Sequence, residues 1–182
     1  MEYLDIVDEN NNLTGNVVER KEVHEKRLFH RHISCWIMNN KGEILLQRRS
    51  YTNKKNPGKW AKSGGHVNSG ETVLQALKRE LNEELGIVVN DNQIIELEIF
   101  KSEKEHYFSY NFLILVDDKI EYKLQKEEVE EVKYFRIEEL ENCKNDDNFV
   151  FYKWTLEDYK KQLDILKEKR KTLIKENIWK KF

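Results

Sequence analysis

Residues 65–87 carry the sequence GHVNSGETVLQALKRELNEELGI. The glycine-rich start permits a tight loop, and we expect Ser69 or Gly70 to begin a helix with Glu71 near the positive end of the helix dipole. Gly86 is placed to end that helix, because glycine readily adopts the left-handed conformation after a helix C-terminus. The stretch therefore predicts a glycine loop that leads into a helix rich in carboxylates.

The glutamates of this helix do not all face solvent. At about 100° per residue, Glu84 falls inside the apolar stripe of the helix, Glu80 falls at its edge, and Glu83 flanks Glu80. Carboxylates turned toward a core are costly unless they are paired or bind a cation, and like charges at this spacing repel. An ordinary charged helix, with its glutamates paired to Arg79 and nearby lysines, is one interpretation. A bound divalent metal ion is the other, and it removes both penalties at once.

The rest of the chain predicts a mixed α/β order within a single domain. Its Pro and Gly residues are concentrated around the stretch above, and no repeat or linker marks a domain boundary. We expect strands at 3–7, 16–19, 32–38, 43–49, 93–101, 106–116 and 129–135, and helices at 72–85, 138–142 and 156–176. Residues 1–182 then form one domain, with an N-terminal hairpin extension at 1–28 and a C-terminal helix at 155–182.

Composition excludes several classes of function. The chain has 182 residues, and 32 Lys+Arg against 34 Asp+Glu give a net charge of -2, which creates no general attraction for nucleic acid or an anionic membrane. Cys35 and Cys143 form no metal-binding or disulfide pattern, and no stretch approaches the roughly 18 apolar residues of a membrane span. We therefore expect a cytoplasmic protein that acts on a small molecule, and the sequence leaves a homodimer open.

The spacing in residues 65–87 is G-x5-E-x7-R-E-(aliphatic)-x-E-E-x-G-(aliphatic), with every specified position met. From composition alone, a chance match is on the order of one in a million. This spacing is that of the Nudix box, and the chain resembles the Nudix hydrolases. The resemblance implies a mixed β-sheet between helices and Mg-dependent cleavage of the diphosphate in a nucleoside diphosphate linked to a second group, X.

The resemblance also implies roles for individual residues. Mg²⁺ or Mn²⁺ would be held by Glu80, Glu83 and Glu84 together with the Gly65 carbonyl, while Glu71 and Arg79 would brace the motif. Oxygen ligands of this kind suit Mg²⁺. The base that accepts a proton from water would be Glu83 or a glutamate of the acidic run at 127–131, with Glu128 as our candidate. A solvated loop is the alternative interpretation of that run.

A second resemblance covers about residues 4–140 and concerns the branch with type I isopentenyl-diphosphate isomerase. It is carried by the segments LDIVDENNNLTG, VHEKRLFHRHIS, KGEILLQRRS and NPGKWAKSGGHV. The resemblance implies that a metal site of three histidines and two glutamates corresponds to His24, His30, His66, Glu103 and Glu105. We expect at least His30, His66 and Glu105 to lie within metal-bridging reach of one another.

Two departures from the isomerases favour hydrolysis. Gly64 stands where those enzymes have a catalytic cysteine, and glycine has no ionisable group for proton transfer. Their box is also degraded, whereas this one is complete. An isomerase-like enzyme is the alternative function, and a catalytically silent nucleotide-binding module is a third.

Basic residues outside the box are further candidates for binding. Arg48, Arg49, Lys54 and Lys55 form a local cationic cluster that could hold phosphates, although a solvated loop is an equal interpretation. The C-terminal helix is basic and amphipathic. We expect it to pack on the domain, rather than to bind nucleic acid, through Leu156, Tyr159, Leu163 and Leu166.

Overall fold

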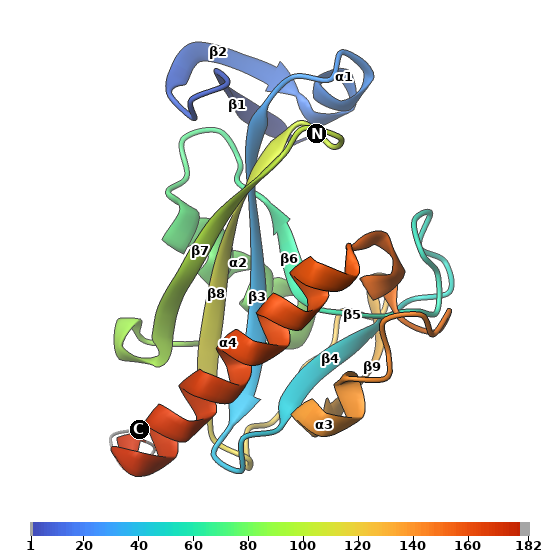
Figure 1. The fold of residues 1–182 in the computed structure, drawn as a ribbon. Helices are drawn as coiled ribbons and strands as arrows, with labels where there is room; N and C mark the ends of the chain where they lie inside the picture. The colour runs from blue at the N-terminus through green and yellow to red at the C-terminus, as the bar shows by residue number, and fades with distance from the viewer. Residues whose placement is uncertain (1, 179–182) are drawn as a thin grey trace.

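The computed structural model describes residues 2–178, apart from the side chains at 152 and 153. The mixed α/β fold with helices on a central sheet is confirmed (Figure 1). The elements are β1 (Tyr3–Val7), β2 (Leu13–Glu19), α1 (Arg20–Glu25), β3 (His30–Asn39), β4 (Ile44–Arg49), β5 (Trp60–Ala61), β6 (Ser63–His66), α2 (Val73–Leu85), η1 (Asp91–Gln93), β7 (Ile94–Ser102), β8 (Tyr107–Val116), β9 (Val129–Phe135), α3 (Ile137–Leu140), η2 (Val150–Lys153) and α4 (Leu156–Lys175).

The central sheet divides between β3 and β4. Its order is β5-β4-β3-β8-β7, with β6 paired to β3 and β9 paired to β4. β3 and β8 run parallel, whereas the other neighbours run antiparallel. The registered pairs between β3 and β4 are Ile37 with Leu45 and Met38 with Ile44, so the N-terminal half of β3 is left to pair with β6.

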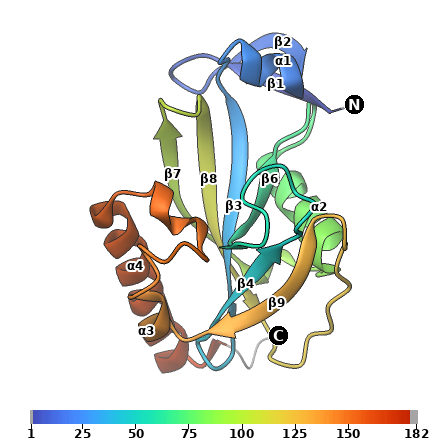
Figure 2. The same cartoon turned by 90° about the vertical axis from the view of Figure 1, so that its right-hand side faces the viewer.

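Two apolar layers hold the helices on opposite faces of the sheet (Figure 2). Alternate β3 residues point to opposite faces, so Cys35 packs with Leu81 of α2 while Trp36 packs with Leu163 of α4. Burial of these apolar side chains is the main favourable term for the fold. The sheet is therefore covered by the carboxylate-bearing helix on one side and by the C-terminal helix on the other.

The N-terminal hairpin forms a small unit at one end of the sheet, together with α1. Leu4, Ile6 and Val23 make its core. Sequence patterning predicted the hairpin, although β2 is longer than the 16–19 strand expected. It did not predict α1, because six residues give too short a periodic pattern to recognise.

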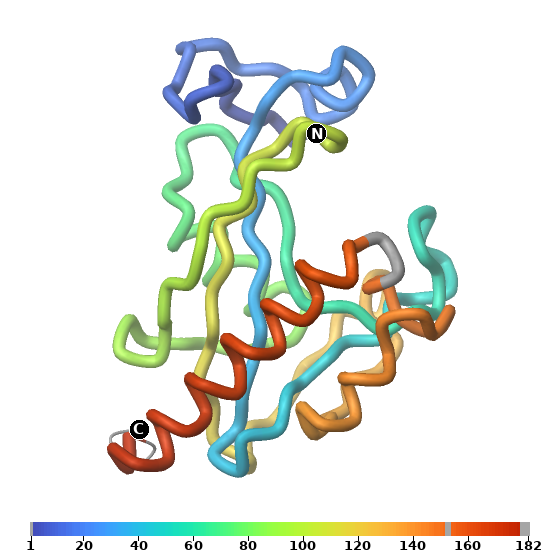
Figure 3. Tube along the Cα trace, in the orientation of Figure 1, coloured from blue at the N-terminus to red at the C-terminus, as the bar shows by residue number. Residues whose placement is uncertain are grey.

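The C-terminal helix crosses the sheet diagonally (Figure 3). Tyr159, Leu163 and Leu166 are buried against the sheet as expected. Leu156 is 56% exposed, so its expected packing is wrong: it lies in the first turn, where the neighbouring chain does not cover it. The helix ends at Lys175, and residues 179–182 of the expected helix lie outside the described residues. None of the helices described is long and apolar enough to cross a membrane.

Candidate active site

The loop before α2 ends later than the sequence suggested. The expected start at Ser69 or Gly70 is wrong, because Gly70, with φ of 80°, keeps the chain in a turn. The expected range 72–85 holds to within one residue, because Thr72 is the N-cap of α2. The Thr72 hydroxyl accepts a hydrogen bond from the Gln75 amide at 3.2 Å, and the Gln75 side chain accepts one from the Thr72 amide at 2.8 Å. The expected end is confirmed, because Gly86 is left-handed with φ of 71°.

Arg79 lies at the centre of the carboxylates. Its guanidinium donates to Glu71 Oε1 and Glu80 Oε1 at 2.8 Å, to Glu83 Oε2 at 3.0 Å, and to the His66 carbonyl at 2.9 Å. Burial acts to lower the pKa of Arg79, but the hydrogen bonds to Glu71 and Glu80 hold it above its usual value. Arg79 therefore ties the loop to the helix and stays charged.

Gly65 makes room for the Glu80 carboxylate. A Cβ atom at Gly65 would lie 2.1 Å from Glu80 Oε1, closer than any real contact. The carboxylate therefore lies directly against the Gly65 backbone. Burial raises the pKa of Glu80, because the charged form loses contact with water there.

Glu84 is a nearly buried carboxylate, 3% exposed. Gln47 Nε2 lies 3.1 Å from each of its two oxygens, and among the described residues Glu84 forms no ion pair. Burial and the charge of Glu80 raise the pKa of Glu84 to about 8. Gln47 Oε1 is itself buried without a hydrogen-bond partner. The Glu84 carboxylate and the unsatisfied Gln47 oxygen are oxygen donors of the kind that a hard divalent cation such as Mg²⁺ prefers.

The candidate base Glu128 lies on a loop that is attached to α2. The Gln125 amide donates to the Glu84 carbonyl at 3.0 Å, and the Ser50 amide donates to the Glu128 carbonyl at 2.8 Å. The charge of Glu128 contributes to the raised pKa values of both Glu80 and Glu84. Glu128 and the half-exposed Glu83 therefore both lie near the buried carboxylates and open to solvent.

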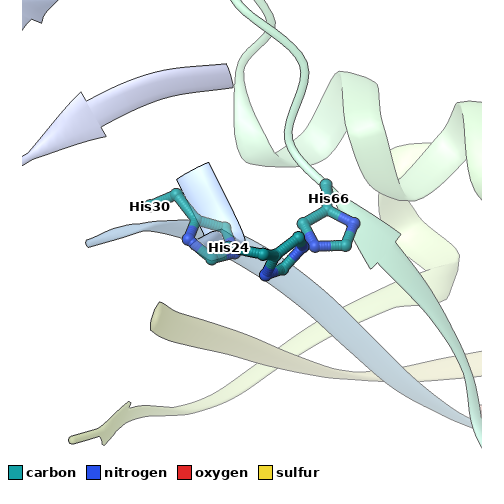
Figure 4. A group of neighbouring side chains, drawn as sticks. All are labelled: His24, His30 and His66. Atoms are coloured by element: carbon teal, nitrogen blue, oxygen red, sulfur yellow. The ribbon is translucent and has the colours of Figure 1, made fainter. Parts of the chain in front are cut away.

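Three histidines from separate elements converge on the other side of β6 from Glu80. His24 comes from α1, His30 from β3 and His66 from β6, and one ring nitrogen of each lies within 4.8 Å of the others (Figure 4). Burial lowers the pKa of all three histidines, to about 4 for His30. Neutral imidazoles with free lone pairs can bind a metal ion.

His30 has the protonation pattern of a metal ligand. Its Nδ1 lies 3.0 Å from the Leu28 carbonyl, which can only accept, so Nδ1 carries the proton and Nε2 carries the lone pair. Nε2 is buried and has no hydrogen-bond partner. A site of nitrogen donors suits Mn²⁺ or Zn²⁺ better than Mg²⁺.

The two glutamates expected beside the histidines do not join them. Glu103 forms an ion pair with Lys101 at 2.6 Å and is exposed, and Glu105 is exposed outside the three-histidine group. The expected approach of Glu105 to His30 and His66 is therefore wrong. The charge of Glu105 only partly offsets the burial that lowers the pKa of His24. Both glutamates lie in the turn between β7 and β8, which directs them to solvent.

The arginines and the lysines of the cationic cluster have different roles. Arg48 donates to the Gly58 carbonyl and to Glu131 at 2.9 Å, and Arg49 donates to the Lys55 carbonyl at 2.9 Å. These contacts occupy both arginines in shaping the loop. Lys54 and Lys55 are exposed, and the charge of Lys55 contributes to the lowered pKa of His24. Lys55 is thus the lysine of the cluster whose charge acts on His24.

The model of the NUDIX domain family matches residues 28–155. The chain belongs to the Nudix family. An uncharacterized Nudix hydrolase of Clostridium acetobutylicum is 35% identical over 76% of this chain and 72% of that protein. Isopentenyl-diphosphate Delta-isomerase 1 of Photorhabdus laumondii is 32% identical over 64% of this chain and 70% of its own length. Both resemblances noted in the sequence are therefore confirmed, and Nudix hydrolases act on diphosphate bonds.

Two further comparisons concern length and fold. Nudix hydrolase 3 of Arabidopsis thaliana is 33% identical over 92% of this chain, but the chain spans 24% of that longer protein. A crystal structure from Deinococcus radiodurans has a TM-score of 0.65 and covers 77% of this chain and 86% of its own, at 22% identity. This likeness shows that the two chains share a fold.

Position 64 separates this Nudix protein from the isomerases in its backbone as well as in its chemistry. A Cβ at Gly64 would lie 2.4 Å from the Ile33 carbonyl oxygen and 3.0 Å from Ser34 Cα. These are backbone atoms of β3, so a cysteine at 64 would require β3 and β6 to move apart. The pairing of β3 with β6 therefore requires glycine at position 64.

Sequence reasoning missed two polar residues, the buried Gln47 and the partly buried Lys62. Gln47 shares a face of β4 with the core residue Leu45, so a polar residue at an inward position of that strand was the available signal. Lys62 lies between β5 and β6, two strands too short to recognise from their pattern. Its burial could not be read from a segment that sequence patterning treats as loop.

Proposed function

We propose that this Nudix protein is a metal-dependent hydrolase that cleaves the diphosphate of a nucleoside diphosphate linked to a second group, X. The observation that carries the proposal is that the buried Glu84 has no ion pair among the described residues and lies near the partly buried Glu80, which is paired with Arg79. Glu71 and Glu83 also bind Arg79, so three carboxylates share one positive charge and Glu84 lies close to them without an ion pair among the described residues. This excess negative charge is matched by a divalent cation that bridges to a diphosphate.

The box supplies the proposed metal ligands. Glu80, Glu83, Glu84 and the Gly65 carbonyl would hold Mg²⁺ or Mn²⁺. The bound cation would neutralise diphosphate charge and lower the pKa of a water molecule. Arg79 and Glu71 fix the loop against the helix, and Gln47 orients the Glu84 carboxylate through its two 3.1 Å contacts.

The remaining charged groups would act on water and substrate. Glu83 or Glu128 would accept the proton of the attacking water, because both are near the buried carboxylates and open to solvent. Lys54 and Lys55 are exposed and would attract the phosphates, whereas the two arginines keep the loop in shape. A small-molecule diphosphate is the proposed substrate, and the cytoplasmic location and the homodimer remain predictions.

A hydrolysis panel tests the function. Purified protein with Mg²⁺ is incubated with nucleoside di- and triphosphates, sugar nucleotides, dinucleotides and prenyl diphosphates in ¹⁸O water. We expect release of phosphate-containing products with ¹⁸O on one of them, and mass spectrometry of both products identifies the attacked phosphorus. Products without label would exclude water as the nucleophile, and no product from any compound would favour a silent binding module.

An isomerase-like activity is the second candidate, and the three-histidine cluster is the observation that favours it. Against it, Gly64 removes one of the two acid–base groups that protonate and deprotonate an allylic carbon. We propose that the cluster holds a second metal ion while hydrolysis is the reaction. Isomerisation of isopentenyl diphosphate should stay at background, and readily measurable turnover would reverse this order.

A further inference from the structure

Lys62 lies where the chain passes from β5, paired with β4, to β6, paired with β3. Its Nζ lies 4.9 Å from the ring centroid of Trp36 and 4.8 Å from that of Trp154. Asn111 Oδ1 accepts a hydrogen bond from it at 3.3 Å. The ammonium group is therefore framed by two indoles and one amide oxygen on the α4 side of the sheet.

This ammonium group has no counterion within the described part of the chain. Lys62 appears in no ion pair there, and Glu98, the carboxylate whose charge reaches it, is engaged elsewhere. The two Glu98 oxygens accept hydrogen bonds from Lys161 Nζ and from Gln162 Nε2. An ammonium has three N–H donors, and Asn111 accepts from one of them.

The missing partner is an anion. Burial lowers the pKa of Lys62 to about 8, so the group is still mostly protonated at neutral pH. Cation–π contacts with Trp36 and Trp154 offset part of the lost hydration, but a desolvated charge is fully compensated by an opposite charge or strong acceptors. No described residue provides one, which leaves a ligand to do so.

The position of Lys62 puts such a ligand on the same side as the histidines. Lys62, Gly64 and His66 alternate along the chain, so their outward directions fall on one face. The four residue steps from Lys62 to His66 span about 13 Å of extended chain. The charge of Lys62 also contributes to the lowered pKa of His32, whose ring centroid lies 5.6 Å from that of His66. The box lies on the α2 side of the sheet, so a substrate bound there by its diphosphate would bring its other end to Lys62 by passing between β3 and β4, which pair only at Ile37–Leu45 and Met38–Ile44.

We propose that Lys62, framed by Trp36, Trp154 and Asn111, binds an anionic substituent on the group X of the substrate. This inference rests on the proposed hydrolase function and narrows its substrate class to nucleoside diphosphates whose X carries a carboxylate or a phosphate. The indole rings of Trp36 and Trp154 exclude water from the Lys62 ammonium and the bound anion. The attraction between these two charges is stronger without water.

Matched substrate pairs test this specificity. UDP-glucuronate and UDP-glucose differ by a carboxylate on X, and ADP-ribose 1″-phosphate and ADP-ribose differ by a phosphate on X, so the two pairs also distinguish a carboxylate from a phosphate. For at least one pair we expect wild-type kcat/KM to favour the acidic member by tenfold or more. Lys62→Met keeps an apolar stem of similar length and should reduce that preference at least tenfold, mainly through KM. Lys160→Met, at an exposed position on α4, is the control and should keep the preference.

A second readout separates binding from a structural role. Removing a desolvated charge should leave the melting temperature of Lys62→Met equal to or above that of wild type. A lower melting temperature, an equal loss for both members of a pair, or an unchanged preference would overturn the proposal. So would a wild-type protein that favours the acidic member of neither pair.

Calorimetric titration of the same four compounds in Ca²⁺ distinguishes this inference from the proposed function. If no compound is hydrolysed, yet Lys62→Met weakens binding of the acidic member alone by tenfold or more, the hydrolase function fails and the Lys62 site stands. If hydrolysis occurs without a preference that depends on Lys62, the function stands and the site fails.

Discussion

Glu84 shows at the scale of one residue how a fold can hold a carboxyl group in position for a metal ion. Its carboxylate lies in the apolar face of α2 with Gln47 as its side-chain partner. Glu84→Gln keeps the shape and removes the charge, so we expect kcat with saturating Mg²⁺ to fall roughly 10²-fold or more. Steady-state kinetics on the best substrate of the panel measure this, with the exposed Glu96→Gln as control. Near-normal turnover of a folded Glu84→Gln protein would refute its role as a metal ligand.

Gly65 gives a second prediction at the residue scale, in which a substitution lowers Mg²⁺ affinity with little effect on stability. The Cβ of Gly65→Ala must displace the Glu80 carboxylate, which is the far end of a side chain, so the backbone can stay in place. We expect Mg²⁺ affinity to fall about tenfold or more with little loss of stability. Gly70→Ala is the opposite case: it has open space but φ of 80°, so it should lose roughly 1 kcal/mol of stability while keeping its Mg²⁺ affinity. Equal effects of the two variants on Mg²⁺ binding would contradict the argument.

Lys62 predicts how stability depends on pH. Its pKa is lowered from 10.5 to about 8 in the folded chain, so between these values the unfolded chain holds a proton that the folded chain has lost. Unfolding then takes up a proton, and the free energy of unfolding rises with pH in this window. Urea denaturation of wild type and Lys62→Met from pH 7 to 10.5 isolates the effect, because Glu98, His32 and Cys35, the other titratable groups nearby, are common to both. A difference between the two proteins that stays constant with pH would contradict it.

At the scale of elements, Asp5 fastens the N-terminal hairpin to the loop before α2. Its carboxylate accepts hydrogen bonds from Ser69 Oγ at 2.7 Å and from the Gly70 amide at 3.0 Å. We expect Asp5→Ala to speed hydrogen exchange across β1, β2 and α1, because these contacts join the unit to the sheet. Asp8→Ala, whose hydrogen bonds stay within its own turn, is the matched control. Unchanged exchange in Asp5→Ala would show that apolar packing and the backbone contacts, such as the hydrogen bond from the Ser69 amide to the Tyr3 carbonyl at 2.7 Å, hold the unit without Asp5.

The same elements show what sequence can and cannot predict. α2 and its buried Glu84 follow from periodicity and spacing, because both are local properties of one helix. The histidines were matched by resemblance, yet the same resemblance failed for Glu105: the turn between β7 and β8, with His106 at φ of 54°, sets its direction. Lys62 and Gln47 depend on how the sheet divides between β3 and β4, and that pairing joins distant segments that local patterning cannot connect.

At the scale of the whole molecule, the two proposed metal sites lie on opposite sides of β6 and have different ligands. The carboxylates belong to the box, whereas the histidines come from α1, β3 and β6. A cation on the histidines would link the N-terminal unit to the sheet, and one on the carboxylates would relieve repulsion along α2. The two sites should therefore stabilise different parts of the fold and prefer different ions.

Thermal denaturation with each ion tests this division. A ligand present at 100 times its Kd adds about 2.7 kcal/mol of stability, which is roughly 5–11 °C for a chain of this size. We expect Mg²⁺ to raise the melting temperature of wild type and His30→Gln, but to have a much smaller effect on Glu84→Gln. Mn²⁺ or Zn²⁺ should still stabilise Glu84→Gln through the histidines, and the double variant should respond weakly to every ion. If His30→Gln removed the Mg²⁺ response, or Glu84→Gln removed the responses to all ions, the two groups would form one coupled centre rather than two sites.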